Sequence, residues 1–264
     1  MITILVNGAY GRMGRAMSAK IMQEEDMRIV AAVDVKGAGT DIGTLNGASP
    51  LGVIIEDDLA EAIEKAHPQV MLDFTNPQAV MKNIRIALGA GVACVVGTTG
   101  LTDEDLAEAE KLAEANDTPI FAASNFAISA VLMMRFAAEA VKYMPQFEIV
   151  ETHHTNKLDA PSGTALTTAK MMCANRPVFE QGQPNSYEAI PGSRGGDYQG
   201  ARIHSVRVPG VISMQDCIFG APGQLLTIRA ESTNAECFFP GVAMALRRIL
   251  SLRGITFGLD KLMD

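Results

Sequence analysis

Residues 2–14, Ile-Thr-Ile-Leu-Val-Asn-Gly-Ala-Tyr-Gly-Arg-Met-Gly, are the stretch that decides the fold. A short apolar run over 2–6 is followed by a glycine-rich turn, and apolar residues then recur at helical spacing over about 12–23. A second apolar run over 29–33 ends at Asp34. Short apolar runs bounded by turns are typical of buried strands. The order strand, turn, helix, strand predicts a βαβ unit.

The turn has glycines at every third position, Gly8, Gly11 and Gly14, where a βαβ unit binds a dinucleotide pyrophosphate. Glycines permit a close backbone approach, and the helix N-terminus favours negative charge. Asp34 follows Gly14 by 20 residues, where a carboxylate can accept hydrogen bonds from ribose hydroxyls. The alternative is an ordinary βα turn with a surface aspartate.

Asp34 also bears on the choice of cofactor. Its charge would repel the 2′-phosphate of NADPH, and Val35 supplies no compensating cation, although Lys36 could reach that phosphate. We therefore predict that NADH is preferred, with NADPH as the second cofactor.

Strands and helices continue to alternate through the first half of the chain. Strands are predicted at 70–74, 92–96 and 119–123, and helices at 77–88 and 102–116. Thr102 and Asp105 suit the N-terminus of the second of these helices. The alternation predicts an α/β domain whose parallel sheet is covered on both faces.

Two loops, 73–77 and 97–100, directly follow buried strands. Open α/β sheets bind ligands at the carboxyl ends of their strands, so both loops are candidates for a binding site. Helix capping, by Thr75 or Asn76 in the first loop, is the alternative.

The pattern changes after Asn125. Helices are predicted at 127–142, 162–174 and 236–252, strands at 148–153, 201–208, 211–219 and 224–231, and a long loop at 175–200. Neighbouring strands joined by short glycine and proline connections predict an antiparallel or mixed sheet. The second half is therefore expected to be an α+β domain.

The segment 148–165 carries the most informative chemistry. His153 and His154 are adjacent and Lys157 lies three residues further on, so up to three positive charges share one loop of an acidic protein. His153 could supply a proton near neutral pH, and Lys157 could hold a carboxylate or stabilise developing negative charge.

A helix is expected to begin directly after this loop, at Ser162, Gly163 and Thr164. Its free N–H groups form a second anion site. The loop and the helix start together suit a small substrate with two carboxylates. The alternative is a solvated basic loop in front of a capped helix.

No metal site is predicted, because neither a cysteine nor an H-x-x-x-H spacing accompanies the histidine pair. We interpret His67 and His204 as structural, and Arg202 and Arg207 as strand-surface residues.

Composition limits the function further. Of 264 residues, 48% are hydrophobic and 20% charged, with a formal net charge of −8. This excludes intrinsic disorder and disfavours nucleic-acid binding. The four cysteines are far apart and the chain start lacks a basic segment, so we expect a reducing compartment, no secretory signal and no membrane span. The expected location is the cytoplasm.

Five motifs occur together over the whole chain: 6–14, 73–75, 97–100, 124–126 and 153–165. With them the chain resembles the 4-hydroxy-tetrahydrodipicolinate reductase family, also called dihydrodipicolinate reductases, of diaminopimelate and lysine biosynthesis. The last motif, His-His-Thr-Asn-Lys-Leu-Asp-Ala-Pro-Ser-Gly-Thr-Ala, is the family's signature.

The resemblance implies a Rossmann-like dinucleotide domain over 1–126 and 237–264, and a substrate-binding domain over 127–236 that builds a homotetramer through its sheet. It also implies hydride transfer from NAD(P)H to an unsaturated cyclic imine dicarboxylate, with water lost from the hydroxylated precursor.

The resemblance further implies roles for individual residues. The residues that would hold the dinucleotide are Gly8, Ala9, Tyr10, Gly11, Arg12, Met13 and Asp34. The residues that would line the nicotinamide side are Gly97, Thr98, Thr99, Ala123, Ser124, Asn125 and Phe126. His153 would be the proton donor and Lys157 its partner, while His154, Gly163 and Thr164 would hold substrate carboxylates.

The chain departs from the family pattern at two positions. Ala230 and Ala235 stand where relatives commonly carry His and Arg, which removes a cation from a site for a dianion. Arg229 is a candidate to compensate, although on a strand it points to the opposite face from Ala230. Two alternatives therefore stay open: a paralogous reductase of another cyclic imine acid, and a nucleotide-sensing protein without turnover.

Overall fold

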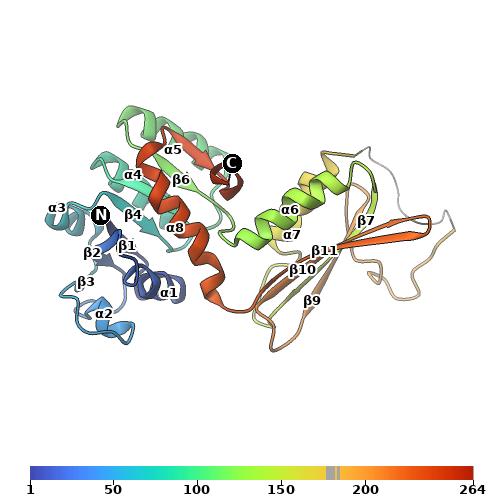
Figure 1. The fold of residues 1–264 in the computed structure, drawn as a ribbon, viewed down its shortest axis with the longest axis horizontal. Coiled ribbons are helices and arrows are strands. Elements are labelled where there is room, and N and C mark those ends of the chain that lie inside the picture. The colour runs from blue at the N-terminus through green and yellow to red at the C-terminus, as the bar shows by residue number, and fades with distance from the viewer. Residues whose placement is uncertain (177–181, 183–184, 264) are drawn as a thin grey trace. The chain divides into compact units, whose positions relative to one another are not determined.

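The computed structural model describes residues 1–176, 182 and 185–263, and the chain divides into two compact units (Figure 1). One unit comprises Met1–Phe126 with Phe238–Asp264, and the other comprises Ala127–Cys237. Among the described residues, none of the helices is both long and apolar enough to cross a bilayer.

The first unit is built on a seven-stranded sheet with the order β12-β6-β5-β4-β1-β2-β3. Every neighbouring pair runs parallel, which confirms the predicted Rossmann-like α/β class. The strands are β1 (Ile2–Asn7), β2 (Met27–Val33), β3 (Ile55–Glu56), β4 (Val70–Asp73), β5 (Ala93–Val96), β6 (Ile120–Ala122) and β12 (Ile255–Phe257). The chain runs outward from β1 to β3 and returns to β4 beside β1, so the switch point lies between β1 and β4.

Helices cover both faces of this sheet. They are α1 (Arg12–Ile21), α2 (Ile42–Leu45), α3 (Leu59–Ala66), α4 (Val80–Gly89), α5 (Asp103–Ala115) and α8 (Phe239–Arg248). One apolar cluster joins α3, α4 and α5 to the sheet, and α8 packs beside α1 on the opposite face (Figure 1). The predicted capping box of Thr102 and Asp105 starts α5.

The C-terminal segment differs from the prediction. The helix expected over 236–252 is limited to α8, with 3₁₀ turns at Ala235–Phe238 and Ile249–Ser251 on either side. Strand β12 was not predicted, because three half-buried to exposed residues show no periodicity that could identify a strand.

The second unit has a five-stranded sheet with the order β11-β10-β7-β9-β8. Its strands are β7 (Gln146–His153), β8 (Gly196–Tyr198), β9 (Ala201–Arg207), β10 (Ser213–Ala221) and β11 (Gln224–Ser232). The β7–β9 pair is parallel and the other pairs are antiparallel, which confirms the predicted mixed sheet. The loop predicted over 175–200 lies partly outside the described residues, and its end forms β8.

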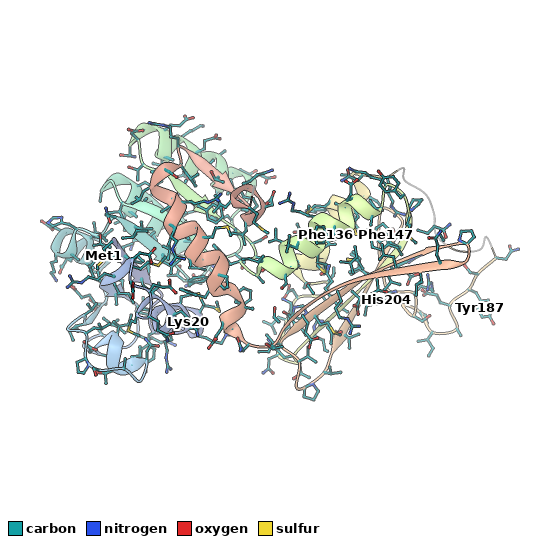
Figure 2. The ribbon with its side chains drawn as sticks, viewed as in Figure 1. Met1, Lys20, Phe136, Phe147, Tyr187 and His204 are labelled. Atoms are coloured by element: carbon teal, nitrogen blue, oxygen red, sulfur yellow. The ribbon has the colours of Figure 1, made fainter. Side chains whose placement is uncertain are left out.

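Two helices, α6 (Ile128–Ala140) and α7 (Gly163–Cys173), cover one face of this sheet. Side chains alternate between the faces along a strand. Phe147 of β7 is 2% exposed on the covered face, whereas His204 of β9 lies on the other face (both labelled in Figure 2). The covered face also holds Glu151, a charged residue that follows the apolar Phe147 and Ile149 along the same side of β7.

Candidate functional site

The glycine turn of the first unit is packed too closely for side chains. A Cβ at Gly8 would lie 2.4 Å from the carbonyl oxygen of Phe74, and Gly8 has a φ of +81°. A Cβ at Gly14 would lie 2.1 Å from the carbonyl oxygen of Gly8. Gly11, which has no side chain to cap α1, precedes the first turn of that helix. The backbone at the start of α1 can therefore approach a phosphate closely.

A cavity of about 770 Å³ opens at the carboxyl ends of β1, β2 and β4. Four of the predicted dinucleotide residues line it: Gly8, Tyr10, Gly11 and Asp34. Lys36 and Lys82 add two cations to its wall. The predicted residues Ala9, Arg12 and Met13 do not line this cavity among the described residues, and Arg12 lies in a neighbouring hollow with Tyr10.

Asp34 is held in place by the backbone. The Tyr10 N–H donates to Asp34 Oδ2 at 2.9 Å, and the Lys36 N–H donates to Asp34 Oδ1 at 2.9 Å. These bonds fix the carboxylate at the end of β2, on the wall of the cavity.

A buried aspartate organises the two strand-end loops. Asp73, the last residue of β4, is 0% exposed and accepts hydrogen bonds from Asn7 Nδ2 and Asn83 Nδ2 at 2.9 and 2.8 Å. The Thr75 and Thr98 hydroxyls donate to its other oxygen at 2.8 and 2.6 Å. Asn76 caps the turn before α4, as its side chain accepts from the Gln78 and Ala79 N–H groups. Asn76 thus caps only the turn that precedes α4, whose own N-cap, Ala79, makes no side-chain hydrogen bond, and Thr75 belongs to the Asp73 network.

Thr98 and its neighbours Gly97 and Thr99 follow β5, and the segment Ala123–Phe126 follows β6, which pairs with β5. The phenyl rings of Phe74 and Phe126 lie 6.2 Å apart. A Cβ at Gly97 would lie 2.1 Å from the ring of Phe74, so a larger residue there would have to displace that ring. The structure thus gathers Gly97 and Phe126 around Phe74, a motif residue for which no individual role is predicted from the sequence.

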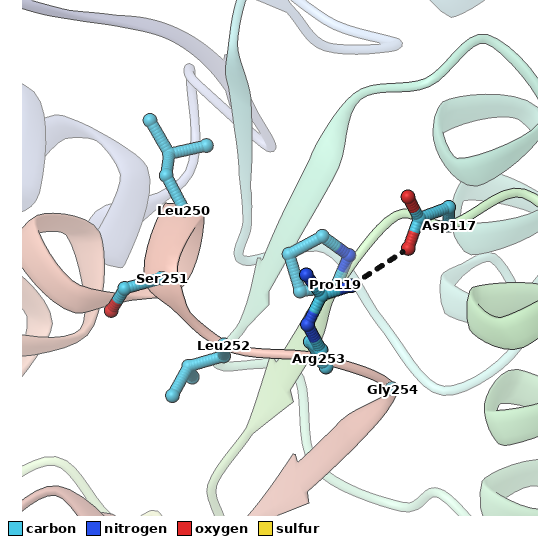
Figure 3. A pocket seen from close by; sticks show the side chains of 7 residues that line it. All are labelled: Asp117, Pro119, Leu250, Ser251, Leu252, Arg253 and Gly254. Atoms are coloured by element: carbon cyan, nitrogen blue, oxygen red, sulfur yellow. Dashed lines mark hydrogen bonds and ion pairs between the residues drawn. The ribbon is translucent and has the colours of Figure 1, made fainter.

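A second hollow in this unit, of about 320 Å³, lies beside Asp117, Pro119 and the segment 250–254 (Figure 3). The Arg253 guanidinium bonds Asp117 there at 3.3 Å. Pro119 and Gly254 directly precede β6 and β12, so this hollow lies at the amino ends of the strands. Ligands of open α/β sheets bind at the opposite edge.

The second unit has its own cluster of charged groups at the end of β7. Glu151 Oε2 lies 2.5 Å from His153 Nδ1, and the Glu151 side chain is 0% exposed. The Arg207 guanidinium donates to both Glu151 oxygens, at 2.8 and 2.9 Å. The Ser162 N–H donates to Glu151 Oε1 at 3.3 Å.

The loop after His153 turns back on itself. The Lys157 N–H donates to the His154 carbonyl at 3.1 Å, and Lys157 Nζ donates to Asp159 Oδ1 at 2.7 Å. The structure therefore pairs Lys157 with Asp159, a residue for which no role is predicted from the sequence. His154 is half-buried beside it.

Helix α7 starts where expected. Ser162 is 2% exposed and its hydroxyl accepts from the Ala165 N–H at 3.2 Å, so this side chain fixes the helix start. Gly163 is exposed, and a Cβ there would meet none of the described atoms within 4 Å. Thr164 follows as the second residue of the helix.

These neighbours shift the pKa values of the cluster. Burial would raise the pKa of Glu151, but hydrogen bonds from Arg207, Ser205 and His153 outweigh it and hold that pKa below its ordinary value. Burial lowers the pKa of His153 and the charges of Lys157 and Arg207 lower it further, against the opposing effect of Glu151. Glu151 is therefore an ionised acceptor for the His153 ring.

Arg207 is a correction to the sequence interpretation, which placed it on the strand surface. Its side chain is 20% exposed and bonds the buried Glu151. Arg202, whose side chain is 30% exposed, contacts Asp197, and His204 contacts Glu148. The sequence prediction gave no role to Glu151. Because Glu151 lies two positions before His153 on one strand, both side chains project from the same face, and this spacing could have identified it.

The two departures from the family pattern lie in β11 and just after it. Ala230 pairs with Gln215, which in turn pairs with Glu151, so all three share one row across the covered face. Arg229 is bound to Asp216 on the opposite face at 2.6 Å, so it does not compensate there. Ala235 lies in the 3₁₀ turn after the strand.

Among the described residues, no group of three or more His, Cys, Asp or Glu side chains could hold a metal ion.

Comparison with known proteins covers both units. Residues 2–126 match the family model for the dihydrodipicolinate reductase N-terminus, and residues 129–263 match that for its C-terminus. The 4-hydroxy-tetrahydrodipicolinate reductase of Moorella thermoacetica is 48% identical over 265 residues, covering 100% of this chain and 98% of the relative. That of Desulfitobacterium hafniense is 47% identical, covering 100% and 99%.

Solved structures agree with these relatives. A dipicolinate-bound dihydrodipicolinate reductase from Paenisporosarcina sp. TG-14 is 40% identical, covers 100% of both chains and superposes with a TM-score of 0.88. A second structure, GenD2 from gentamicin A biosynthesis in complex with NAD, is 14% identical and covers 99% and 90% of the chains, with a TM-score of 0.66. This second likeness concerns the fold alone.

Proposed function

The chain belongs to the dihydrodipicolinate reductase family, and from this membership we infer that it reduces 4-hydroxy-tetrahydrodipicolinate to tetrahydrodipicolinate in diaminopimelate and lysine biosynthesis. The reaction consumes one NAD(P)H and one proton and releases one water. The observation that carries the inference is the match of both family models over nearly the whole chain.

The residues at the glycine turn fit a pyridine nucleotide. The packing around Gly8 and Gly14 leaves bare backbone at the start of α1, and the Asp34 carboxylate on the cavity wall can accept from a ribose. A bound reduced nicotinamide supplies the hydride. We assign Gly8–Met13 and Asp34 to holding the dinucleotide, and Gly97–Thr99 with Ala123–Phe126 to the nicotinamide side.

In the second unit, the chain's own groups supply the proton and bind the anion. Hydride addition to a conjugated cyclic imine pushes electrons into the ring, so a proton must arrive from a donor. His153 at the end of β7 is that donor. His154, Gly163 and Thr164 hold the substrate carboxylates, where the helix start stabilises negative charge. Lys157, the predicted catalytic partner of His153, holds a carboxylate and stabilises negative charge as it develops. Ser162 contributes by fixing the start of α7.

The cofactor preference is for NADH. Asp34 is fixed by two backbone N–H groups on the cavity wall, where its charge opposes a 2′-phosphate. Lys36 and Lys82 line the same cavity and allow NADPH as the weaker cofactor.

The assembly is a homotetramer formed through the second unit. Both described helices of that unit lie on one face of its sheet, and the other face carries Leu225 and Val206, which are 73% and 37% exposed.

Residues 1–126 with 237–264 serve as the dinucleotide domain, and 127–236 as the substrate-binding and tetramerisation domain. Four cysteines without disulfides suit the cytoplasm, and the charge of −8 speaks against a nucleic-acid partner.

A coupled assay tests this function. Dihydrodipicolinate synthase generates the unstable substrate in place, and loss of NADH or NADPH absorbance reports turnover. The expected kcat/KM is at least about 10⁴ M⁻¹s⁻¹, the lower end of the ordinary enzyme range. Tight NADH binding without turnover would instead indicate that the substrate is another cyclic imine acid. This outcome is worth testing because Ala230 and Ala235 replace residues that relatives commonly carry.

A further inference from the structure

We propose that Glu151 is a positioning residue for the proton donor: clamped by Arg207, it holds the His153 ring so that Nδ1 faces the protein and Nε2 is the nitrogen that delivers the proton. This rests on the proposed function, because it assigns the atom through which His153 acts.

The first support is the burial of Glu151. The side chain is 0% exposed and continues the row of Phe147 and Ile149 on the helix-covered face of the sheet. A buried carboxylate is costly unless it is paired and hydrogen-bonded. If position 151 served only to pack the core, an apolar residue would be more stable there. The buried carboxylate therefore indicates a specific function.

The second support is the contact with His153. Glu151 and His153 are two residues apart on β7 and therefore project from the same face. The 2.5 Å separation places a hydrogen on Nδ1, because an ionised carboxylate only accepts hydrogen bonds. When the ring is protonated, the proton that it can release to a substrate is then the one on Nε2.

The third support is Arg207, which occupies both carboxylate oxygens and keeps Glu151 ionised. The same guanidinium donates to the Asp159 carbonyl at 2.8 Å. Asp159 in turn binds Lys157. Arg207 thus ties the orientation of His153 to the loop that carries the proposed carboxylate ligand.

The chain contains a matched control on the same strand. Glu148 also accepts from a histidine, His204, with Nε2 at 2.8 Å, and from Arg194. It lies on the opposite face of the sheet and its side chain is 29% exposed. Replacing Glu148 by Gln makes the same chemical change without touching His153.

The first measurement is the ring tautomer of His153 in the unmodified protein, by NMR of ¹⁵N-histidine-labelled enzyme. The chain has four histidines, and a His153→Gln variant assigns the signal. We expect the neutral ring to carry its hydrogen on Nδ1. A hydrogen on Nε2 would overturn the proposal, and this test needs neither turnover nor a Glu151 variant that folds.

The second measurement compares Glu151→Gln with Glu148→Gln in the coupled assay. Glu151→Gln should lower kcat at least about tenfold while NADH binding changes less than about twofold, because the effect concerns proton donation. Among the described residues, the charged groups that shift the pKa of His153 are Glu151, Lys157 and Arg207, and of these three Glu151 alone raises it, so Glu151→Gln should lower that pKa. The basic limb of the kcat profile should therefore move to lower pH.

Glu148→Gln should leave kcat and its pH profile unchanged. A Glu151→Gln enzyme with wild-type kcat and pH profile would refute the positioning role. Absence of turnover in the unmodified enzyme would refute the proposed function, and the tautomer measurement would still decide the role of Glu151.

Discussion

The hydroxyl of Thr98, at the end of β5, donates a 2.6 Å hydrogen bond to the fully buried carboxylate of Asp73, at the end of β4. Asn7 of β1 and Asn83 of α4 bind the other oxygen of the same carboxylate. One side chain therefore joins the ends of three adjacent strands where the sheet order reverses. The loop proposed to line the nicotinamide depends on this network for its position.

Replacing Asp73 by Asn should destabilise the protein by about 2–4 kcal/mol, because an amide cannot accept from donors on both sides and leaves buried groups unsatisfied. Urea unfolding measures the change. Asp58→Asn is the control: Asp58 caps α3 at an exposed position, where Asn caps equally well, so about 0.5 kcal/mol or less is expected. Equal effects of the two substitutions would contradict the role of Asp73.

Gly14→Ala should weaken NADH binding at least about tenfold, since the new Cβ would lie 2.1 Å from the Gly8 carbonyl oxygen and must displace the turn. Titration calorimetry reports the affinity. Gly89→Ala, at the end of α4, places its Cβ more than 4 Å from the described atoms that could obstruct it and should leave NADH affinity unchanged. Unaltered binding by Gly14→Ala would show that the turn does not form the dinucleotide site.

Asp34→Asn should change the cofactor ratio. Removing the charge relieves repulsion of a 2′-phosphate while keeping an acceptor for the ribose, so kcat/KM for NADPH relative to NADH should rise about tenfold or more. The coupled assay with each nucleotide measures the ratio. The prediction fails if the unmodified enzyme already has the higher kcat/KM with NADPH.

Local signals predicted much of this fold correctly. The glycine turn predicted the first βαβ unit, and Thr102 with Asp105 marked the start of α5, because both depend on residues close in sequence. The second sheet was predicted from its apolar runs. Strand β12 was missed, since only its pairing with β6 makes those three residues a strand.

The site in the second unit was harder to predict. His153 and Lys157 stand out as charges in one loop, but Arg207 meets Glu151 across 56 residues. That contact depends on the parallel register of β7 and β9, which sequence periodicity alone does not fix. The pairing of Lys157 with Asp159 similarly requires the conformation of the loop.

That pairing leads to a test of the proposed carboxylate site. Pyridine-2,6-dicarboxylate is a flat dianion similar to the substrate, and Lys157 is proposed to bind one of its carboxylates. Lys157→Ala should weaken its binding by about 1.5–3 kcal/mol, the loss expected for a charged hydrogen bond, or about 10- to 150-fold. Competitive inhibition of the coupled assay, or calorimetry in the presence of NADH, measures this affinity.

Lys142→Ala is the matched control, because Lys142 is also paired with an acidic neighbour, Glu139 at 2.6 Å, and lies in the same unit. Lys142→Ala should bind the dianion with the affinity of the unmodified enzyme. A lower affinity of Lys157→Ala alone would then show that the position of the lost charge matters for binding, because both variants lose one positive charge. Equal weakening by both would mean that the dianion senses only the overall charge of the protein. Asp159→Asn should act in the opposite direction to Lys157→Ala, since it removes the anion that competes with a carboxylate for the Lys157 ammonium.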